Sequence, residues 1–316
     1  GALKKACEVF EQLPVRGVVS WNILISGYAQ NGLAAEAVKC FRQMQDEGIL
    51  ADSVTCLSIL KACVILGDLE MGQDIDAKVR KQGLLHENPS IGNALVDMYA
   101  KCGAIGRARD VFDQLQVRNV ISWTALITGY VEQGYCEKAL RCLGMMAHEG
   151  ISPNAITLLS ILKASSNNRD IKAGQGTHIE LVKKGHEADG IIRNSLVDMY
   201  AKCGNLTEAH DELERLPDRS IVTWTTLTTR YASYDDKSNV MYLLEKMEGE
   251  CVEGDGVILL SILTTHAHIG IVDEGLILKA STLCNVNSYP ILKVNGGLQL
   301  LAKSLKECMF THKVDR

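Results

Sequence analysis

The chain is poor in proline and in aromatic residues: of its 316 residues, five are proline and four are phenylalanine. Scarce proline leaves long stretches in which a helix can continue, and abundant alanine, leucine, lysine and glutamate favour short helices joined by tight turns. Hydrophobic residues make up 47% of the chain, enough for a large core. No apolar run approaches the roughly 18 residues of a membrane helix. The composition therefore predicts an all-α protein without a membrane segment.

The cysteines do not point to disulfides or to a metal. Their number, 11, is odd and no signal-like start precedes them, so we expect a reducing compartment. Cys102 and Cys203 lie in two copies of the sequence KCG, at the end of a predicted helix, and are predicted to be small buried residues. His178 and Glu180 form a His-x-Glu, but no Cys-x-x-Cys occurs, so the zinc site of a nucleobase deaminase is excluded. We predict no enzyme, no metal and no cofactor.

Charge gives no support for a nucleic-acid partner. The chain has 33 basic and 38 acidic residues, a formal net charge of -5. Such a balance mildly opposes binding to a polyanion. Any affinity for nucleic acid must therefore come from a local arrangement of side chains.

Three phrases return in a fixed order along the chain. The first contains a tryptophan, and its copies place Trp21, Trp123 and Trp224 at separations of 102 and 101 residues. We expect these tryptophans to pack between repeats rather than to stack on a ligand. The copies are SWNILISGY (20–28), SWTALITGY (122–130) and TWTTLTTRY (223–231); LSILKA (57–62 and 159–164) with LSILTT (260–265); and NALVDMYAKCG (93–103) with NSLVDMYAKCG (194–204).

Each phrase opens a pair of helices. In 89–119 apolar residues recur at helical spacing, Gly103 ends the first helix, and Ala108, Val111 and Phe112 resume the same spacing. One hairpin cannot bury its apolar face alone, so stacked hairpins are expected to form a right-handed α-solenoid. The predicted units are 18–52, 53–88, 89–119, 120–154, 155–189, 190–220 and 221–255, with a partial unit (second helix only) at 1–17 before them and degenerate segments at 256–289 and 290–316 after them.

The third period departs from the first two. Glu212 stands where the earlier copy has Val111, in the apolar face of a second helix. A buried glutamate is costly unless it is paired or exposed. The sequence therefore predicts either an ion pair or an exposed side chain at this position.

The openings VVSWNILISGYAQNG, SVTCLSILKACVILGDLEMG and IGNALVDMYAKCG, in units of 35, 36 and 31 residues, resemble the pentatricopeptide repeat proteins of plants. Their order resembles the subclass that alternates P, L and S motifs, and the resemblance covers roughly residues 1 to 280. It implies single-stranded RNA binding in mitochondria or chloroplasts, one base per repeat. The subclass acts mostly in C-to-U editing. The chain opens inside a unit whose first helix is missing, so we expect a fragment that lacks its N-terminus. Nothing here resembles the deaminase domain of the subclass, so the resemblance implies that a deaminase acts in trans.

The resemblance places base reading at the fifth and the last residue of P-like units (18–52, 120–154, 221–255) and S-like units (89–119, 190–220). L-like units (53–88, 155–189) have Leu57 or Leu159 at the fifth position and should read weakly or not at all. Aliphatic second residues are expected to sandwich the bases, or else to belong to the core: Val19, Ile121, Ile191 and Val222. The reading pairs are Asn22 with Asp52, Asn93 with Asn119, Thr124 with Asn154, Asn194 with Ser220, and Thr225 with Asp255.

The chemistry of these side chains suggests which base each pair prefers. An ionised Asp only accepts hydrogen bonds, which suits the ring N–H of uracil or guanine, whereas Asn can donate to the ring nitrogen of cytosine or adenine. Thr at the fifth position leaves room for a purine, and Asn reaches a pyrimidine. In chain order, the first pair predicts U, the second predicts C with U tolerated, the third predicts A, the fourth predicts a pyrimidine, and the fifth predicts G. With RNA parallel to the protein, the string is U-N-Y-A-N-Y-G.

Other hypotheses remain open at this point. Polar residues near a helix start, such as Asn22 or Thr225 taken alone, are commonly caps or solvated positions. An array of helical hairpins with negative net charge and no basic stripe also suits a protein-interaction scaffold. A decayed copy that folds but reads nothing is a third hypothesis, because the third period is less regular.

Overall fold

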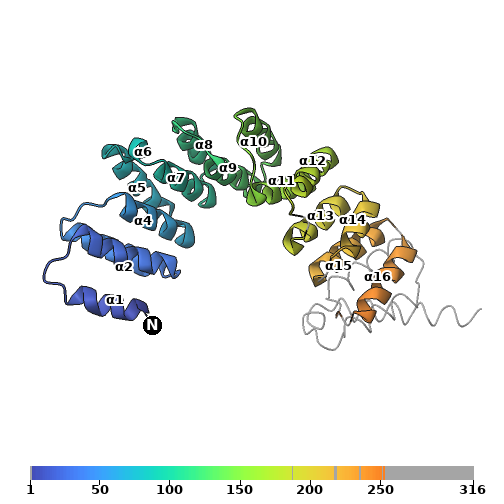
Figure 1. Cartoon of the computed structure of the whole chain (residues 1–316), viewed down its shortest axis with the longest axis horizontal. Coiled ribbons are helices and arrows are strands. Elements are labelled where there is room, and N and C mark those ends of the chain that lie inside the picture. Colours follow the sequence, from blue (N-terminus) through green and yellow to red (C-terminus); the bar gives the residue numbers. More distant parts are fainter. Residues whose placement is uncertain (1, 187, 217–218, 235, 251, 253–316) are drawn as a thin grey trace, which may run out of the picture. The chain divides into compact units, whose positions relative to one another are not determined.

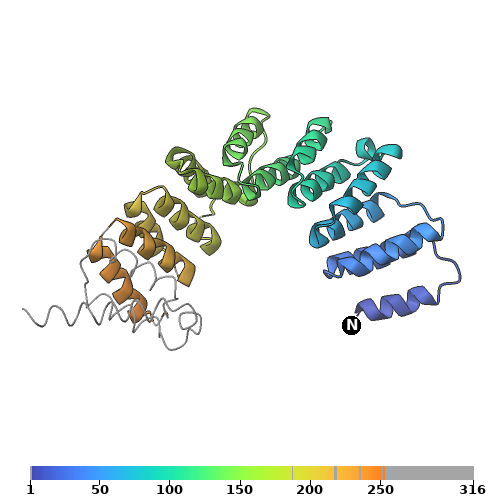
Figure 2. The ribbon, with the colours of Figure 1, turned by 180° about the vertical axis from the view of Figure 1, so that it is seen from behind.

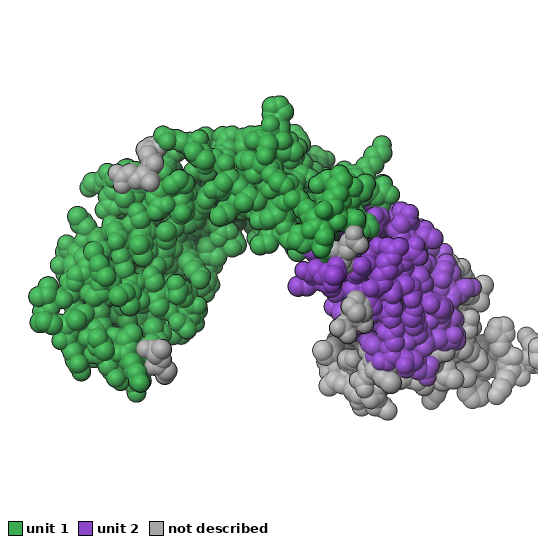
Figure 3. Space-filling model, in the orientation of Figure 1, with its two compact units in different colours: residues 1–186 green, residues 187–316 purple. Residues whose placement is uncertain are grey.

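The computed structural model describes residues 2–186, 188–216, 219–234, 236–250 and 252. It divides into two compact units, residues 1–186 and residues 187–316, each of which is described by itself (Figure 3). All regular structure in these described ranges is α-helical, which confirms the predicted all-α class (Figure 1). The predicted segments 256–289 and 290–316 lie outside the described residues.

The helices follow one another as hairpins. Each of the seven predicted ranges contains a first and a second helix, and we propose these ranges as the repeat boundaries. The short α6 was not predicted, since four residues carry no periodicity. The first unit contains α1 (Ala2–Glu11), α2 (Val18–Gln30), α3 (Ala34–Asp46), α4 (Ser53–Leu66), α5 (Leu69–Lys81), α6 (Leu84–Glu87), α7 (Pro89–Lys101), α8 (Ile105–Gln114), α9 (Val120–Glu132), α10 (Cys136–His148), α11 (Ala155–Asn168) and α12 (Ile171–Lys183); the second contains α13 (Gly190–Lys202), α14 (Leu206–Glu214), α15 (Ile221–Ser233) and α16 (Lys237–Gly249).

Stacking of the first helices builds the scaffold. In the first unit α2, α4, α7, α9 and α11 pack on one another in that order. The second helices α8, α10 and α12 lie on the outer side of its curve, as seen from both faces (Figures 1 and 2). In the second unit α13 packs on α14 and α15, and α15 packs on α16. One helix per repeat is thereby presented along the inner side of the first unit.

Glycine sets the turn inside the S-like hairpins. Gly103 has φ +81° and Gly204 has φ +83°, a left-handed conformation that glycine adopts without steric cost. The predicted end of the first helix at Gly103 is confirmed, because α7 stops at Lys101. The chain then reverses at once into α8.

The tryptophans lie in the core, as predicted. Trp21, Trp123 and Trp224 are all at most 1% exposed. Phe10 meets Trp21, and Phe112 meets Trp123, in edge-to-face contacts with 4.6 Å between ring centroids. Such contacts hold each first helix against the second helix that precedes it. The tryptophans are therefore unavailable as a stacking surface for a ligand.

A charged clamp recurs at the same place in each period. An arginine two residues before a P-like unit bonds a glutamate at the end of that unit's second helix: Arg16 with Glu47 (3.2 Å), Arg118 with Glu149 (2.8 Å), and Arg219 with Glu250. The same arginines lie over the rings of Phe10, Phe112 and Trp224, respectively. Each clamp ties the loop before a P-like unit to the end of that unit's second helix, because the arginine lies in that loop.

Cys102 and Cys203 are half-buried, so the prediction that they are buried was wrong. Each is the residue that follows the last helical position, where the chain turns outward. The Cys102 thiol donates to the Cys63 carbonyl (3.8 Å), and burial together with nearby Asp68 and Asp97 raises its pKa. Among the described residues there is no helix of the length and apolarity needed to cross a bilayer.

Candidate nucleic-acid interface

In the four P-like and S-like units whose last residue the structure describes, that residue is the N-cap of the next first helix. Asp52 and Asn154 accept from the backbone N–H of Thr55 and Thr157, each at 2.9 Å, at the starts of α4 and α11. Asn119 caps α9 and Ser220 caps α15 in the same way. Asp, Asn and Ser are preferred N-caps because their oxygens satisfy N–H groups that lack a helical partner. These last residues are therefore caps, which is compatible with a role in binding. Asn22 and Thr225, for which capping was the alternative, lie inside α2 and α15 and are not caps.

The fifth residues lie beside these caps on the preceding first helix. Asn22, Asn93 and Thr124 are 8%, 7% and 9% exposed, respectively. Asn194 and Thr225 are half-buried on α13 and α15. The predicted partner of Thr225, Asp255, lies outside the described residues.

Asn22 and Asp52 are joined directly. The Asn22 amide nitrogen donates to Asp52 Oδ1 (3.0 Å) and Oδ2 (2.8 Å), while its oxygen accepts from the Thr55 hydroxyl (2.5 Å). Asp52 Oδ1 also caps α4, so Oδ2 is the carboxylate oxygen with fewer partners. The Asp52 carboxylate is therefore an acceptor whose orientation is fixed by three donors: the Asn22 amide, the Thr55 backbone N–H and the Thr55 hydroxyl.

Hydrogen bonds keep Asp52 ionised. Burial raises the pKa of its carboxyl, but hydrogen bonds from the Thr55 backbone, the Asn22 amide and the Thr55 hydroxyl lower it below the usual 3.8. The carboxylate is thus a pure acceptor throughout the physiological pH range.

Thr124 and Asn154 are joined through a second hydroxyl. The Thr157 hydroxyl lies 2.6 Å from the Thr124 hydroxyl and donates to Asn154 Oδ1 at 2.9 Å. Asn154 Oδ1 therefore accepts from both the backbone and the side chain of Thr157. Because its oxygen faces the helix, the amide presents its NH₂ group on the other side.

The Asn194 and Ser220 pair repeats this arrangement in the second unit. The Thr223 hydroxyl donates to Asn194 Oδ1 at 2.6 Å and lies 2.7 Å from the Ser220 hydroxyl. In contrast, the structure shows no hydrogen bond between Asn93 and Asn119. Asn119 Oδ1 accepts from the N–H groups of Ile121 and Ser122, and the buried Asn93 Oδ1 has no partner among the described residues. Three of the four described pairs are thus bridged and one is not.

The second residues are exposed, so the alternative that they belong to the core was wrong. Val19, Ile121, Ile191 and Val222 are 60–69% exposed, although aliphatic side chains usually avoid water. The L-like units add Val54 and Ile156 at the same position, 49% and 60% exposed. A row of aliphatic side chains therefore stands next to the fifth residues along the first helices.

A hollow of ≈ 480 Å³ gathers predicted residues of three successive first helices in the first unit. Asn93 and Lys101 come from α7, Ile121 and Thr124 from α9, and Asn154 caps α11. We name it the first-helix hollow. Residues predicted from two adjacent repeats, 89–119 and 120–154, thus share one depression.

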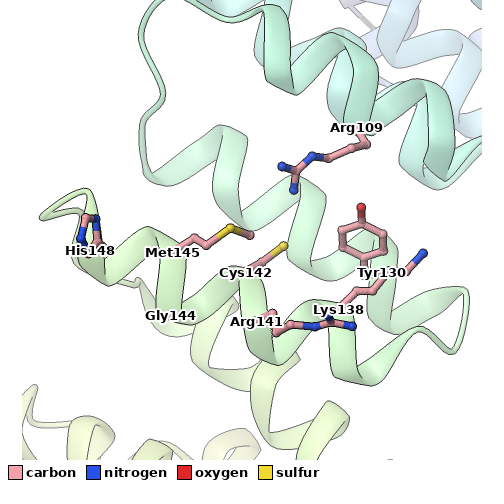
Figure 4. Close-up of a pocket in the computed structure, with 8 residues that line it drawn as sticks. All are labelled: Arg109, Tyr130, Lys138, Arg141, Cys142, Gly144, Met145 and His148. Atoms are coloured by element: carbon pink, nitrogen blue, oxygen red, sulfur yellow. The ribbon is translucent and has the colours of Figure 1, made fainter.

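A larger hollow of ≈ 740 Å³ lies elsewhere, among α8, α9 and α10 (Figure 4). It contains none of the predicted residues. Its side chains include Arg109, Tyr130, Lys138, Arg141 and His148 around Cys142 and Met145. Arg109 is bonded to Asp113 (2.8 Å), and Lys138 lies over the rings of Tyr130 and Tyr135, so two of its cations already have partners.

The third residue of each unit was missed by sequence reasoning. Thr55, Thr157 and Thr223 connect the fifth and last residues of the unit before them. A signal was present: the phrases SVT, AIT, VIS and IVT put Ser or Thr three residues after each predicted last residue. Ser or Thr at that spacing from a cap is typical of a helix start.

The described residues contain no group of three or more histidine, cysteine or acidic side chains placed to hold a metal ion. His178 and Glu180 lie on the second helix α12. Glu180 is bonded to Lys183 at 2.9 Å. The arrangement of polar groups described above is one for hydrogen bonding, with the donors and acceptors of each pair set by helix caps.

Family models identify the repeats. A model described as the PPR repeat family matches residues 16–64 and 118–167, and a model of the PPR repeat matches residues 93–120 and 191–217. The chain belongs to the pentatricopeptide repeat family. A putative mitochondrial pentatricopeptide repeat protein of Arabidopsis thaliana is 32% identical over 87% of this chain and 45% of its own length. A chloroplastic one is 34% identical over 85% of this chain and 43% of its own length.

The chain thus spans less than half the length of these curated pentatricopeptide repeat relatives. Solved structures share the fold. The crystal structure of the pentatricopeptide repeat protein PPR10 from maize covers 90% of this chain and 46% of its own, with a TM-score of 0.62 at 17% identity. PPR10 in complex with an 18-nt psaJ RNA element covers 89% of this chain and 48% of its own, with a TM-score of 0.53 at 17% identity.

Proposed function

We propose that this chain binds single-stranded RNA and reads one base with each P-like and S-like repeat. The observation that carries the proposal is the meeting of fifth and last residues through hydrogen bonds, next to a row of exposed aliphatic side chains. Asn22 with Asp52 and Asn194 with Ser220 show it in separate units. Such an arrangement serves recognition, since folding alone does not require aliphatic side chains in water.

Each pair offers its own pattern to a base edge. The Asp52 carboxylate accepts from the ring N–H of uracil, and the NH₂ groups of Asn119 and Asn154 donate to the ring nitrogen of cytosine or adenine. Thr124 leaves room for a purine. The proposed string remains U-N-Y-A-N-Y-G, its last base resting on Thr225 and Asp255.

Aliphatic second residues supply the non-specific part of the affinity. Val19, Ile121, Ile191 and Val222 can each cover one face of a base, since every base has an apolar face. This term does not depend on sequence. Affinity and specificity are therefore assigned to different positions of the same repeat.

Relatives support an RNA partner and an organelle. One relative is named mitochondrial and another chloroplastic, and PPR10 was solved with an 18-nt RNA element. By analogy, the proposed setting is RNA processing in a mitochondrion or chloroplast, by a binding module rather than an enzyme. The P, L, S order of the units adds the finer proposal that the chain selects sites for C-to-U editing by a deaminase acting in trans.

A titration tests the proposal. Fluorescence anisotropy with an RNA that carries U-N-Y-A-N-Y-G is compared with the same bases permuted, at one stated salt concentration. We expect at least tenfold tighter binding of the predicted string, because each hydrogen-bonded base adds about 1 to 3 kcal/mol of discrimination. Asp52→Asn replaces an acceptor by a donor and should move the preference at the first base from U to C.

The contrary results are as definite. Equal, weak binding of both RNAs would refute base reading. Under that outcome the protein-interaction scaffold, which the net charge of -5 favours, becomes the leading function.

A further inference from the structure

The third residue of a unit matches the fifth residue of the unit before it. At the six junctions between the seven units, a hydroxyl side chain follows each polar fifth residue and an isoleucine follows each leucine; at the seventh junction the polar Thr225 is followed by Ile258, which lies outside the described residues. At six successive junctions the pairs are Asn22 and Thr55, Leu57 and Ile91, Asn93 and Ser122, Thr124 and Thr157, Leu159 and Ile192, and Asn194 and Thr223. Helix capping alone does not explain the match, because a cap has no reason to follow the chemistry of the previous unit.

The threonines and the serines at this position behave differently. Thr55, Thr157 and Thr223 all reach the fifth residue of the preceding unit, at 2.5, 2.6 and 2.6 Å. Ser122 instead donates to the Asn119 backbone carbonyl (2.9 Å), and Ser20 donates to the Gly17 carbonyl (2.8 Å). Threonine has one strongly restricted side-chain torsion because it is branched at Cβ, whereas serine rotates more freely.

The two S-like repeats show what this difference does to a fifth residue. In 190–220 the Thr223 hydroxyl donates to Asn194 Oδ1, which fixes the oxygen on the Thr223 side of the amide and the NH₂ group on the opposite side. In 89–119 the Asn93 Oδ1 is buried without a partner among the described residues, although Ser122 is in the same register. The flip state of the Asn93 amide is therefore not held by a hydrogen bond from a described residue to its oxygen, as that of Asn194 is.

The flip state of the asparagine amide decides whether a base meets its NH₂ group or its oxygen. Both pyrimidines present the O2 carbonyl, an acceptor, so an asparagine must offer NH₂ to bond either of them. If the amide is flipped, its own oxygen faces O2 and the bond is lost. A fixed amide therefore separates pyrimidines from purines better than a free one.

We infer that the third residue of each unit is a positioning residue, whose threonine hydroxyl sets the orientation of the base-reading residue in the unit before it. The inference rests on the proposed RNA reading and deepens it. It makes 190–220, bridged by Thr223, the more selective S-like repeat, and 89–119, followed by Ser122, the more tolerant one.

A reciprocal exchange in the full chain tests it. Ser122→Thr and Thr223→Ser each keep the hydroxyl and move one methyl group. The readout is the ratio of Kd values for purine over pyrimidine at the third base of the string, read by 89–119, and at the sixth, read by 190–220. We expect Ser122→Thr to raise the ratio at the third base, and Thr223→Ser to lower it at the sixth, each about three- to tenfold, the worth of one hydrogen bond.

Ser20→Thr is the matched control, since it makes the same change in the same register where no fifth residue precedes it in the described chain. It should leave both ratios unchanged. A purely structural role of the third residue would lower affinity for all RNAs equally and leave every ratio as it was. That result overturns the inference while the preference of the unmodified chain for its string still stands.

A second measurement needs no RNA. Side-chain amide resonances of ¹⁵N-asparagine report whether an amide is held, and we expect Asn194 to lose its distinct, slowly exchanging signals in Thr223→Ser and Asn93 to gain them in Ser122→Thr. Unchanged amide signals in both variants overturn the inference. If the unmodified chain shows no base preference, the proposed function fails, and these signals still decide whether the third residue positions the amide.

Discussion

The two S-like repeats, 89–119 and 190–220, keep almost the same first helix but solve the packing of the second helix in opposite ways. The earlier repeat is apolar at this contact, with Gly92 on α7 and Val111 on α8. The later repeat has Arg193 and Glu212 at the same two positions. Asn93 and Asn194 face the predicted RNA side in both, so the back of a hairpin can change while the reading position stays.

Close approach explains the earlier solution. A Cβ on Gly92 would lie 2.4 Å from Leu115 Cδ2, so any side chain on α7 at this place would require the Leu115 side chain to shift. In the later repeat Glu212, 3% exposed, is held by Arg193 (3.0 Å) and Arg215 (2.8 Å). The predicted requirement for a partner at Glu212 is confirmed. A buried charge is tolerated when its partner lies on the facing helix.

Removing that partner should give the largest effect. Arg193→Ala removes the more buried of the two arginines that bond the Glu212 carboxylate, and we expect a loss of about 3 kcal/mol in the free energy of unfolding. Urea unfolding followed by circular dichroism measures it. Arg109→Ala, which removes the exposed pair with Asp113, is the control and should cost at most about 1 kcal/mol.

The double variant Arg193→Ala, Glu212→Val sharpens the test. It restores an apolar contact like that of the earlier repeat, and its stability should return to within about 1 kcal/mol of the parent. A double variant as unstable as Arg193→Ala would show that the ion pair is not what separates the two repeats.

Gly129→Ala should have the next largest effect. A Cβ there would lie 2.5 Å from Ala100 Cβ and 3.4 Å from Ala100 Cα, neither of which can rotate away, so α7 and α9 must move apart. We expect a loss of about 2 kcal/mol, read from the urea midpoint. The matched control is Gly27→Ala, which meets only the flexible end of Leu3 at 3.1 Å and should change little. The third period has Arg230 at this place.

The tryptophans give a smaller contrast. Trp123 Nε1 donates to Glu149 Oε2 at 2.9 Å, whereas Trp224 Nε1 is buried with no partner among the described residues. Trp123→Phe therefore loses a hydrogen bond that Trp224→Phe does not, and should be less stable by about 1 kcal/mol more. Thermal unfolding of the two variants measures the difference. Equal losses would show that the indole bond contributes nothing.

This difference depends on pH in a known direction. Burial raises the pKa of Glu149, but hydrogen bonds from Arg118 and Trp123 lower it below the usual 4.5. A depressed folded pKa means that the stabilisation is present above the unfolded value and is lost as pH falls through the folded one. The gap between the two tryptophan variants should be constant from pH 8 to about pH 5 and close below about pH 4.

The smallest effect concerns phosphate contacts. Lys101 lines the first-helix hollow, paired with Asp97 at 2.9 Å. Lys101→Ala should weaken RNA binding about twofold for every sequence and lower the salt slope by about 1. Arg141→Ala, in the larger hollow among α8, α9 and α10, is the control and should leave affinity unchanged. The reverse result would place RNA on the second helices.

The helices and turns that follow from the spacing of residues in the sequence were predicted, whereas contacts between residues far apart in the sequence were missed. Helical hairpins, the turn at Gly103 and the buried tryptophans follow from spacing and glycine chemistry, which are local. The clamp from Arg118 to Glu149 was missed because its partners are 31 residues apart and lie on the surface, where no periodicity marks them.

The candidate site divides in the same way. The fifth and last residues were predicted by resemblance, and the capping role of the last residues was not foreseen, because capping was considered for fifth residues such as Asn22. The bridge from Thr223 to Asn194 was not foreseen either, because it joins residues 29 apart across two repeats and depends on a side-chain torsion. The half-buried state of Cys102 was missed because the phrase NALVDMYAKCG contains both the helix and the turn after it, and Cys102 lies at the boundary between them.

Under the proposed function, a side chain that both reads a base and begins a helix limits how the repeat can evolve. Asp52, Asn119, Asn154 and Ser220 are all good N-caps, so exchange among these residue types alters the preferred base at nearly constant stability. A leucine or valine in the same place would remove the cap and the recognition together. The residue types allowed at the last position of the repeat are therefore the few that can cap an α-helix. On the proposed function, neutral substitution among them is a route by which one scaffold acquires new RNA targets.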